Sequence, residues 1–231
     1  MAGAAHPPPV IAVDGPGGVG KGTLCRHLAR TLGWHLLDSG SLYRLTALAA
    51  GRRGLVLTDA GAVAEVARTL NVQFEEGRDE TRIVLEGEDV TDLLRSETCG
   101  NAASQVAALP AVRAALLQCQ RDFRRPPGLV ADGRDMGSVV FPAAEVKIFL
   151  TASPEERAAR RYKQLREKGL SVSLPTLVKE IAERDQRDAG RPVAPLRPAA
   201  EAVIVDTTGL GIDAVRQRAL AIVRERLALP T

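Results

Sequence analysis

Short apolar runs recur along the chain, and longer segments with the spacing of amphipathic helices separate them. Five largely apolar runs are too short for helices and rich in Val, Ile and Leu: residues 10–13, 34–37, 129–131, 146–150 and 202–205. A continuous apolar run indicates a strand that is buried on both faces, as in parallel sheets. Because helical segments separate these strands, the pattern predicts an α/β fold with a doubly wound, five-stranded parallel sheet.

Three segments of the chain carry clear helix signals. Residues 21–32 place leucines at helical spacing on one face. The sequence Ser153-Pro154-Glu155-Glu156 is a capping box with proline at the first helical position, so we expect a helix over residues 153–168. A last amphipathic helix is expected over residues 212–227.

The interval between the second and third predicted strands is too long for one crossover helix. Residues 72–75 and 81–85 alternate apolar and polar positions around a turn at 76–79, which predicts an antiparallel hairpin. We therefore expect a small β insertion at about residues 66–105. The prediction is one domain over residues 10–231, preceded by a disordered, proline-rich tail at residues 1–9.

Composition narrows the class of protein. The chain of 231 residues has 31 Lys and Arg against 28 Asp and Glu, spread throughout, and only 3% aromatic residues. Such a surface argues against nucleic-acid binding and against base stacking. Three Cys and three His without ligand spacing predict neither a disulfide framework nor a zinc site. Without a signal peptide or a long apolar run, the predicted location is the cytoplasm and not a membrane.

A glycine-rich segment follows the first predicted strand and precedes the first helix. It consists of Gly15, Pro16, Gly17, Gly18, Val19, Gly20, Lys21, Gly22 and Thr23. Four residues separate the glycine that opens the loop from the glycine before the lysine. This spacing lets backbone N–H groups surround a phosphate while the lysine ammonium reaches its outer oxygens. Together with the strand and helix on either side, it predicts a phosphate-binding loop rather than a chance glycine-rich turn.

The residue after the loop lysine indicates which class of phosphate-binding protein this is. Many such loops have Ser or Thr there as a Mg²⁺ ligand, but here Gly22 comes first and Thr23 follows. We therefore expect Mg²⁺ to be held mainly by nucleotide phosphates and water, with no metal site built from protein ligands. The variant is similar to the loop of nucleoside monophosphate kinases rather than that of GTPases, and an Asn-Lys-x-Asp motif is absent from the sequence.

Acidic or small polar residues follow the predicted strands. The carboxyl ends of parallel strands lie along one edge of the sheet, which is where ligands bind in such folds. Asp132 follows the third strand and is placed to orient Mg²⁺-bound water, although an aspartate here can also simply cap the next turn. Arginines occur in the same connecting segments. Each alone reads as a surface charge, but together they suggest binding of several phosphate groups.

Four segments resemble the bacterial cytidylate kinase family. They are Leu-Leu-Asp-Ser-Gly-Ser-Leu-Tyr-Arg at 36–44, Asn-Ala-Ala-Ser-Gln-Val-Ala at 101–107, Asp-Gly-Arg-Asp-Met-Gly-Ser-Val-Val-Phe-Pro at 132–142 and Glu-Arg-Asp-Gln-Arg-Asp at 183–188. The resemblance extends from about residue 10 to residue 229 in the same order. Adenylate kinases share the glycine loop but differ after the second and third strands and lack the hairpin insertion.

The resemblance implies roles for residues that match the family's motifs. Residues 15–23 would bind the phosphates of ATP. The acceptor nucleotide and its phosphate would contact Ser39, Tyr43, Arg44, Arg134 and Arg191. The cytosine base would be read by Ser104, Arg113 and Asp135, and the ribose by Arg184 and Asp188. Lys21, Asp132, Arg134 and Arg191 would support catalysis. The family also has a short mobile lid over ATP, which would fall at about residues 157–170 with Arg157, Arg160, Arg161 and Lys163, of which Arg160 would contact ATP. A plain surface helix is an equal alternative for this cluster.

The activity that the resemblance implies is transfer of the γ-phosphate of ATP to CMP or dCMP, with Mg²⁺ and in line, by a monomer. No general base is expected, because the attacking phosphate oxygen is already ionised at neutral pH. Two alternatives stay open. The acceptor could be UMP or a small alcohol, or the chain could be a nucleotide-dependent binding module, although its Lys21, Asp132 and arginines argue against the latter.

Overall fold

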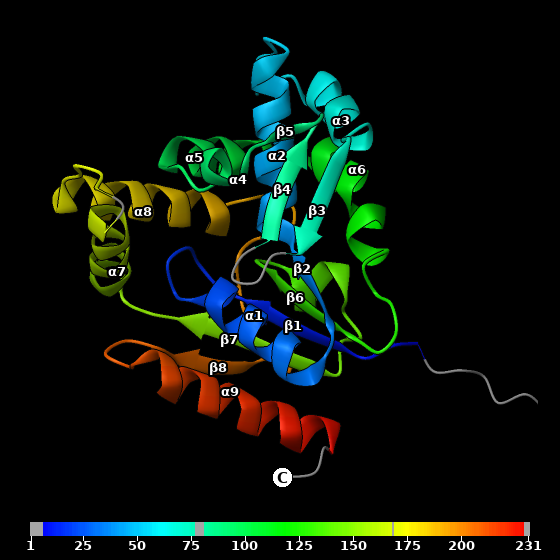
Figure 1. Cartoon of the computed structure of the whole chain (residues 1–231), viewed down its shortest axis with the longest axis vertical. Helices are drawn as coiled ribbons and strands as arrows, with labels where there is room; N and C mark the ends of the chain where they lie inside the picture. The colour runs from blue at the N-terminus through cyan, green and yellow to red at the C-terminus, as the bar shows by residue number, and fades with distance from the viewer. Residues whose placement is uncertain (1–6, 77–80, 168, 229–231) are drawn as a thin grey trace, which may run out of the picture. The chain divides into compact units, whose positions relative to one another are not determined.

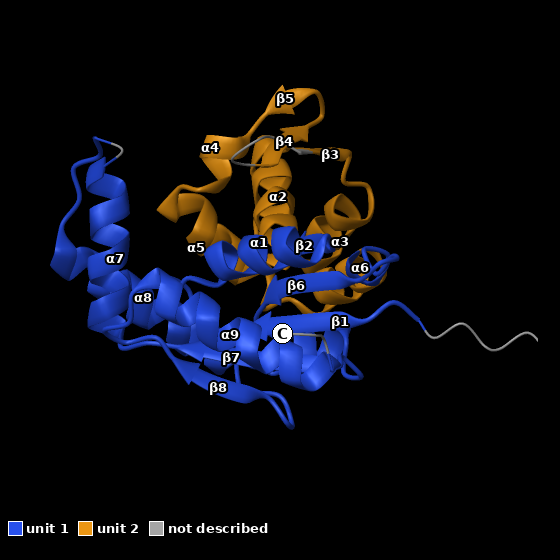
Figure 2. Cartoon of the chain, turned by 60° about the horizontal axis from the view of Figure 1, so that its bottom comes forward, with its two compact units in different colours: residues 1–38, 120–231 blue, residues 39–119 orange. Residues whose placement is uncertain are grey.

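The computed structural model describes residues 7–76, 81–167 and 169–228. The chain forms two compact units (Figure 2). Unit 1 comprises residues 1–38 and 120–231, and unit 2 comprises residues 39–119.

Unit 1 is built on a five-stranded sheet (Figure 1). Its strands are β1 (Val10–Asp14), β2 (His35–Asp38), β6 (Leu129–Gly133), β7 (Val146–Thr151) and β8 (Val203–Asp206). All pairings are parallel, in the order β2-β6-β1-β7-β8. The predicted α/β fold with a doubly wound parallel sheet is therefore confirmed. β1 and β6 are buried at every position, whereas the edge strands β2 and β8 are partly exposed, so the central strands have the most continuous apolar runs.

Two helices cover one face of this sheet. They are α1 (Lys21–Leu32) and α9 (Ile212–Leu227), and both were predicted with these bounds. Leu24 and Leu28 of α1 and Ala219 of α9 belong to the same buried cluster as Ile11 and Ile148 of the sheet. Gly20, directly before the first helical residue, adopts a left-handed conformation with φ of 95°, which glycine allows without steric cost.

A pair of helices, α7 (Pro154–Glu167) and α8 (Leu174–Ala189), follows β7. The side chain of Ser153 accepts a hydrogen bond from the backbone N–H of Glu156 at 3.2 Å, as the capping box predicts. Ala158, Leu165 and Leu177 form a small apolar cluster between the two helices. The predicted end of α7 at residue 168 lies outside the described residues.

Unit 2 combines helices with a three-stranded antiparallel sheet. Its elements are α2 (Ser39–Arg52), α3 (Ala60–Arg68), β3 (Val72–Glu76), β4 (Thr81–Leu85), β5 (Glu88–Asp89), α4 (Thr91–Leu94), α5 (Glu97–Val106) and most of α6 (Pro110–Arg121). The antiparallel pairing of β3 with β4 confirms the predicted hairpin, although residues 77–79 of its predicted turn lie outside the described residues. The predicted insertion, at about residues 66–105, covers only part of this unit.

The two-residue strand β5 escaped prediction because it is too short to show an alternating pattern.

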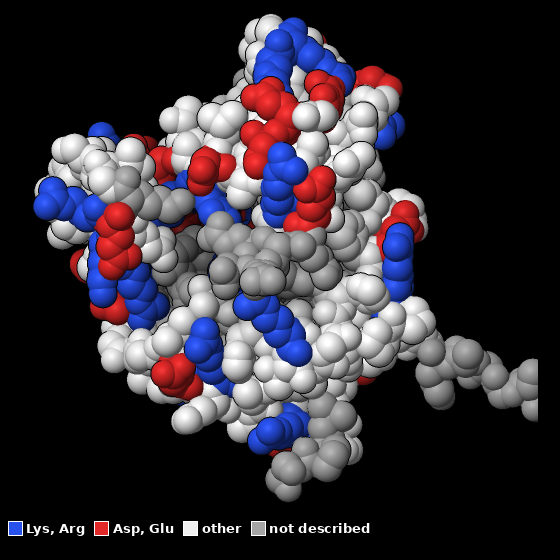
Figure 3. Space-filling model, viewed as in Figure 1, with Lys and Arg blue, Asp and Glu red and all other residues white. Residues whose placement is uncertain are grey.

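Acidic and basic side chains are interspersed on the face shown in Figure 3. Within unit 2, Arg82 pairs with Glu75 and Asp89 on neighbouring strands. Among the described residues, none of the helices is both long enough and apolar enough to cross a membrane.

The amino end of β1 is tied to its surroundings by hydrogen bonds. The carboxylate of Glu145 accepts from the backbone N–H of Val10 at 2.7 Å. The carbonyls of Pro8 and Pro9, which the sequence placed in a disordered tail, accept hydrogen bonds from the side chain of Arg124 and the backbone of Leu129. Residues 1–6 of that tail lie outside the described residues.

The start of β6 offers a test of packing in unit 1. A Cβ at Gly128 would lie 2.6 Å from Cε2 of Trp34, which is closer than ring and methyl can approach. Gly128→Ala should therefore lower the free energy of unfolding by about 1–3 kcal/mol. At Gly51, near the end of α2, a Cβ meets nothing within 4 Å, so Gly51→Ala should raise stability by up to about 1 kcal/mol. Calorimetric unfolding of both variants checks this, and an unchanged Gly128→Ala protein would show that Trp34 has room to move.

Candidate functional site

The glycine loop connects β1 to α1 in the predicted position. Gly15 has φ of 147°, and a Cβ there would overlap the carbonyl oxygen of Leu150 in β7. A side chain at this position would therefore push the loop away from the sheet. The loop ends at the amino terminus of α1, where free backbone N–H groups and the helix dipole favour a bound anion. The geometry is that of a phosphate-binding loop.

The loop lysine is buried and folds back over the loop. Lys21 Nζ donates a hydrogen bond to the carbonyl of Pro16 at 3.0 Å and lies 3.8 Å from Oδ1 of Asp132. Burial lowers the pKa of Lys21, and nearby Arg134 lowers it further. Burial also raises the pKa of Asp132, while the Lys21 ammonium opposes this rise. Each group thus limits the cost of burying the other's charge.

Two arginines of unit 1 face the loop. A Cβ at Gly17 would lie 3.6 Å from Nη2 of Arg134 and 3.7 Å from Nη1 of Arg184. Arg134 donates from Nε to Oδ2 of Asp188 in α8 at 2.9 Å. Burial alone would raise the pKa of Asp188, but Arg134 and Arg184 together hold that pKa below its usual value. The structure therefore gathers three cationic side chains, those of the two arginines and Lys21, at one loop.

Asp188 also organises the end of α8. Its backbone carbonyl accepts hydrogen bonds from Nε of Arg191 at 3.2 Å and from the backbone N–H of Leu196 at 2.9 Å. Arg191 is buried. The carboxylate and the carbonyl of one residue thus hold two arginines that the sequence selected as site residues.

Arg157 lies in the segment where the resemblance implies a lid over ATP. Only 3% of its surface is exposed. Its guanidinium donates to the carbonyl of Gly17 in the loop at 3.1 Å and to both carboxylate oxygens of Asp185 in α8. Arg157 therefore links the loop to α8. Sequence reasoning missed this role because the basic residues around it in α7 suggested a solvent-facing cluster.

Arg160, the predicted ATP contact in the same helix, is hydrogen-bonded within unit 1. Its guanidinium donates to the hydroxyl and the carbonyl of Thr207 at 3.0 and 2.6 Å, and to Glu156 at 3.0 Å. The Thr207 hydroxyl in turn lies 3.5 Å from the carbonyl of Val19 in the loop. Arg160 is thus placed near the loop through Thr207, and its contact with ATP stays a prediction.

Asp14 is a buried carboxylate whose role the sequence did not reveal. Its two oxygens accept the backbone N–H groups of Met136 and Gly137 at 2.8 and 2.9 Å. These are the first residues of a π-helical turn, η1 (Met136–Val140), which follows Asp135. Burial raises the pKa of Asp14 to about 6, although the two N–H donors counteract it. The sequence signal was present, an aspartate at a strand end, but it did not indicate the partner.

Of the remaining predicted site residues, Asp135 is buried in unit 1 and the others belong to unit 2. Ser39 is the first residue of α2 and Ser104 lies in α5, and both are buried. The guanidinium carbon of Arg113, in α6, lies 5.7 Å from the ring centroid of Tyr43, in α2, within the range of a cation–π contact. Arg44 donates to the carbonyls of Leu94 and Ser96. The structure thus brings Tyr43 and Arg113 together and holds Arg44 at the turn between α4 and α5.

A metal ion would find few protein ligands in the part of the chain that the structure describes. There, no three His, Cys, Asp or Glu side chains are grouped so that they could hold one. The carboxylate of Asp132 lies beside the loop, with Oδ2 3.5 Å from where a Cβ on Gly22 would be.

A parallel sheet whose first strand leads into a glycine loop and a buried lysine defines a P-loop nucleotide-binding protein. Comparison with known proteins gives the family. The model of the cytidylate kinase family matches residues 11–225. The cytidylate kinase of Aeromonas hydrophila is 57% identical over 219 residues, which cover 95% of each chain. That of Pseudomonas aeruginosa is 60% identical over 209 residues, covering 90% of this chain and 91% of that one. The protein belongs to the cytidylate kinase family.

Among solved structures, a shikimate kinase from Bacteroides thetaiotaomicron is similar over 95% of this chain and 98% of that one, with 15% identity and a TM-score of 0.47. This likeness adds nothing to what the strand order already establishes about the fold.

The buried carboxylate of Asp14 predicts an unusual pH dependence of stability. Its pKa is raised from 3.8 to about 6, so the folded protein holds this proton more tightly than the unfolded chain. The resulting stabilisation is complete below pH 3.8 and is lost as the pH rises through 6. Relative to Asp14→Asn, the wild-type free energy of unfolding should therefore rise by about 2 kcal/mol between pH 7 and pH 4.5.

Urea unfolding of both proteins at the two pH values measures this difference. Effects of all other titrating groups cancel in the comparison, provided that they do not interact with Asp14. A difference that stays constant with pH would contradict the raised pKa.

Proposed function

We propose that the protein transfers the γ-phosphoryl group of ATP to CMP or dCMP, giving ADP and CDP or dCDP. The observation that carries this proposal is the buried Lys21 on a phosphate-binding loop that Arg134 and Arg184 face, in a chain of the cytidylate kinase family. Three cations at one loop suit two phosphorylated substrates, whose phosphates carry more charge than one lysine can offset.

On the donor side, residues 15–23 would bind the phosphates of ATP, with Arg160 as a further contact. Lys21 is held within reach of bound phosphates by Pro16 and Asp132. Mg²⁺ would be held through phosphate oxygens and water, and Asp132 would orient one of these waters. When bound, the metal ion neutralises negative charge on the transferred group. The place of Asp132 beside Gly22, where a hydroxyl ligand often stands, fits this arrangement.

On the acceptor side, the arginines would position the phosphate of CMP for in-line attack. Its attacking oxygen is ionised at neutral pH, so the protein has no proton to remove. Lys21, Arg134 and Arg191 would then act by placing the two phosphates and by stabilising charge as it moves between them. The carboxylate and carbonyl of Asp188 support this role, because they fix both arginines before substrate arrives.

The other proposed contacts are with the acceptor nucleotide, its ribose and its base. Ser39, Tyr43 and Arg44 would bind the acceptor nucleotide, Arg184 and Asp188 its ribose, and Ser104, Arg113 and Asp135 its base. The burial of Ser104, Arg113 and Asp135 supports base reading, since buried polar groups discriminate strongly between hydrogen-bond partners. The lid at about residues 157–170, the insertion at about 66–105, the monomeric state and the cytoplasmic location stay predictions.

Lys21 provides the first test of this function. Lys21→Ala should lower kcat at least about 100-fold, because the lysine stabilises charge in the transition state. Lys179→Ala removes a lysine that is 78% exposed on α8 and serves as the matched control, with unchanged kcat. ADP release coupled to CMP addition measures both. A folded Lys21→Ala protein with substantial activity would contradict the role of the loop.

Selectivity for cytosine provides the second test. Cytosine presents an amino donor beside the N3 acceptor, whereas uracil presents a carbonyl and an N–H. With Arg113 as the proposed donor and Asp135 or Ser104 as the proposed acceptor, buried polar groups would therefore stay unpaired when UMP binds. Each mismatch costs about 1–3 kcal/mol, so kcat/KM for UMP should be about 100-fold lower or more.

Ser104→Ala should narrow the ratio of kcat/KM for CMP to that for UMP. Thr46→Val is the control, because it also removes a buried hydroxyl of unit 2, one that donates to the carbonyl of Leu42 within α2. This change should leave the ratio intact. Equal use of CMP and UMP by the unmodified protein would exclude the proposed base contacts.

A further inference from the structure

Asp14 joins two segments that carry site residues. It is the last residue of β1, and the phosphate-binding loop begins with the next residue. Its carboxylate accepts the backbone N–H groups of Met136 and Gly137, which directly follow Arg134 and Asp135. Only 4% of Asp14 is exposed, so water cannot replace it as the acceptor for these two N–H groups.

The residues of the turn that Asp14 holds are tied to one another and move together. Met136 is fully buried, and a Cβ on Gly137 would lie 3.2 Å from Cγ of Lys147. The turn closes on itself with a hydrogen bond from the N–H of Phe141 to the carbonyl of Met136 at 2.7 Å. A shift at its first two residues would therefore carry the preceding Arg134 with it.

The phosphate-binding loop, which begins directly after Asp14, is held in place by other contacts. Arg157 donates to the carbonyl of Gly17, and the first loop glycine lies directly against the Leu150 carbonyl. Loss of the Asp14 contacts should therefore displace the turn rather than the loop. The guanidinium of Arg134 faces the loop at Gly17, so a small displacement of the turn changes the place where it meets a phosphate.

We propose that Asp14 is a positioning residue, which aligns Arg134 with the phosphate-binding loop through its two hydrogen bonds to the turn after Asp135. The proposal rests on the proposed function, because it assigns Arg134 to the acceptor phosphate. It explains why a carboxylate is buried here: two adjacent N–H donors require two acceptor oxygens. An asparagine offers one oxygen and one NH₂ group, so one N–H would face a donor.

The variant Asp14→Asn tests this assignment with the purified full-length chain. We expect kcat/KM for CMP to fall about tenfold or more, since a hydrogen bond to a charged group contributes that much. Part of this loss should be a rise in KM for CMP, while KM for ATP stays within about twofold. A merely structural role would lower the amount of folded protein and hence kcat, but would leave both KM values unchanged. Equal changes in the KM values for CMP and ATP would overturn the proposal.

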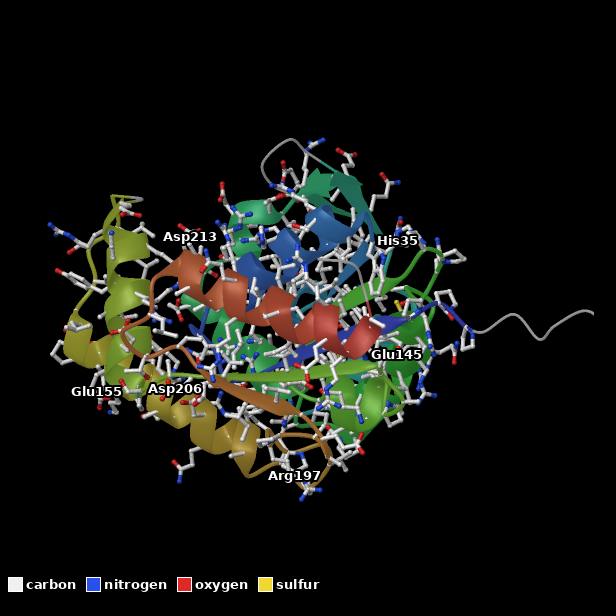
Figure 4. The ribbon with its side chains drawn as sticks, turned by 90° about the horizontal axis from the view of Figure 1, so that it is seen from below. His35, Glu145, Glu155, Arg197, Asp206 and Asp213 are labelled. Carbon is white, nitrogen blue, oxygen red and sulfur yellow. The ribbon has the colours of Figure 1, made fainter. Side chains whose placement is uncertain are left out.

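Glu145→Gln is the matched control. Glu145 also accepts a backbone N–H of β1 through its carboxylate, at 2.7 Å, but at the opposite end of that strand. In Figure 4, Glu145 lies at one end of the sheet, and Asp206, the last residue of β8, marks the other end. This change should lower the unfolding temperature without changing kcat/KM for CMP.

A double-mutant cycle with Arg134→Ala separates failure of this proposal from failure of the proposed function. If Asp14 acts through Arg134, adding Asp14→Asn to Arg134→Ala should cost less than twofold more in kcat/KM for CMP. Fully additive losses would overturn the positioning role. If Arg134→Ala alone left kcat/KM for CMP unchanged, the assigned role of Arg134 would be wrong instead.

Should Asp14→Asn fail to fold, Asp14→Glu serves in its place, because it keeps both acceptor oxygens and moves them by one methylene. We then expect Asp14→Glu alone to lower kcat/KM for CMP as Asp14→Asn would. Added to Arg134→Ala, it should cause no further loss. An unchanged kcat/KM for CMP in the folded Asp14→Glu protein would overturn the proposal.

Discussion

Burial of positive charge beside the phosphate-binding loop is the constraint on which the rest of the site depends. A cation taken out of water costs several kcal/mol unless a partner offsets the loss of hydration. In unit 1, three cationic groups at the loop each have a carboxylate in place before any phosphate arrives. The pairs are Lys21 with Asp132, Arg134 with Asp188 and Arg157 with Asp185. Carboxylates thus determine where the positive charge of the site lies.

This arrangement suits a reaction in which no proton needs to be removed. Transfer between two phosphates depends on their alignment and on charge that is already oriented when they bind. The side chain of Asp188 fixes Arg134, and the backbone carbonyl of Asp188 fixes Arg191. Neither arginine therefore has to be ordered at the moment of reaction. The guanidinium of Arg157 is likewise held in place, by the carbonyls of Gly17 and Ala152 and by the carboxylate of Asp185.

Much of the fold was predictable because its signals are local. Buried central strands give continuous apolar runs, and α1 and α9 were predicted at their observed bounds. The loop was recognisable because its glycines are required at fixed spacing. The partners of buried charges were not, because they depend on tertiary structure. Arg157 and Asp185 are 28 residues apart, and each looks like a surface charge in sequence. The helices of unit 2 were also underestimated, since the short alternating strands within them gave the clearer signal.

The two strand-end aspartates show most directly what sequence could not supply. Asp14 and Asp132 each end an apolar run, and both were read as polar residues at the edge of the sheet. The register pairs Asp132 with Val13 and Asp14 with Gly133. Neighbouring residues of a strand point to opposite faces, so Asp132 shares the face of Val13, which packs with α1, and meets Lys21. Asp14 points to the other face and meets η1 instead. A shift of β6 by one residue would turn Asp132 to the face of Asp14 and away from Lys21. The register of β6 against β1 therefore decides that Asp132 meets the loop lysine, while Asp14 holds the turn after Arg134.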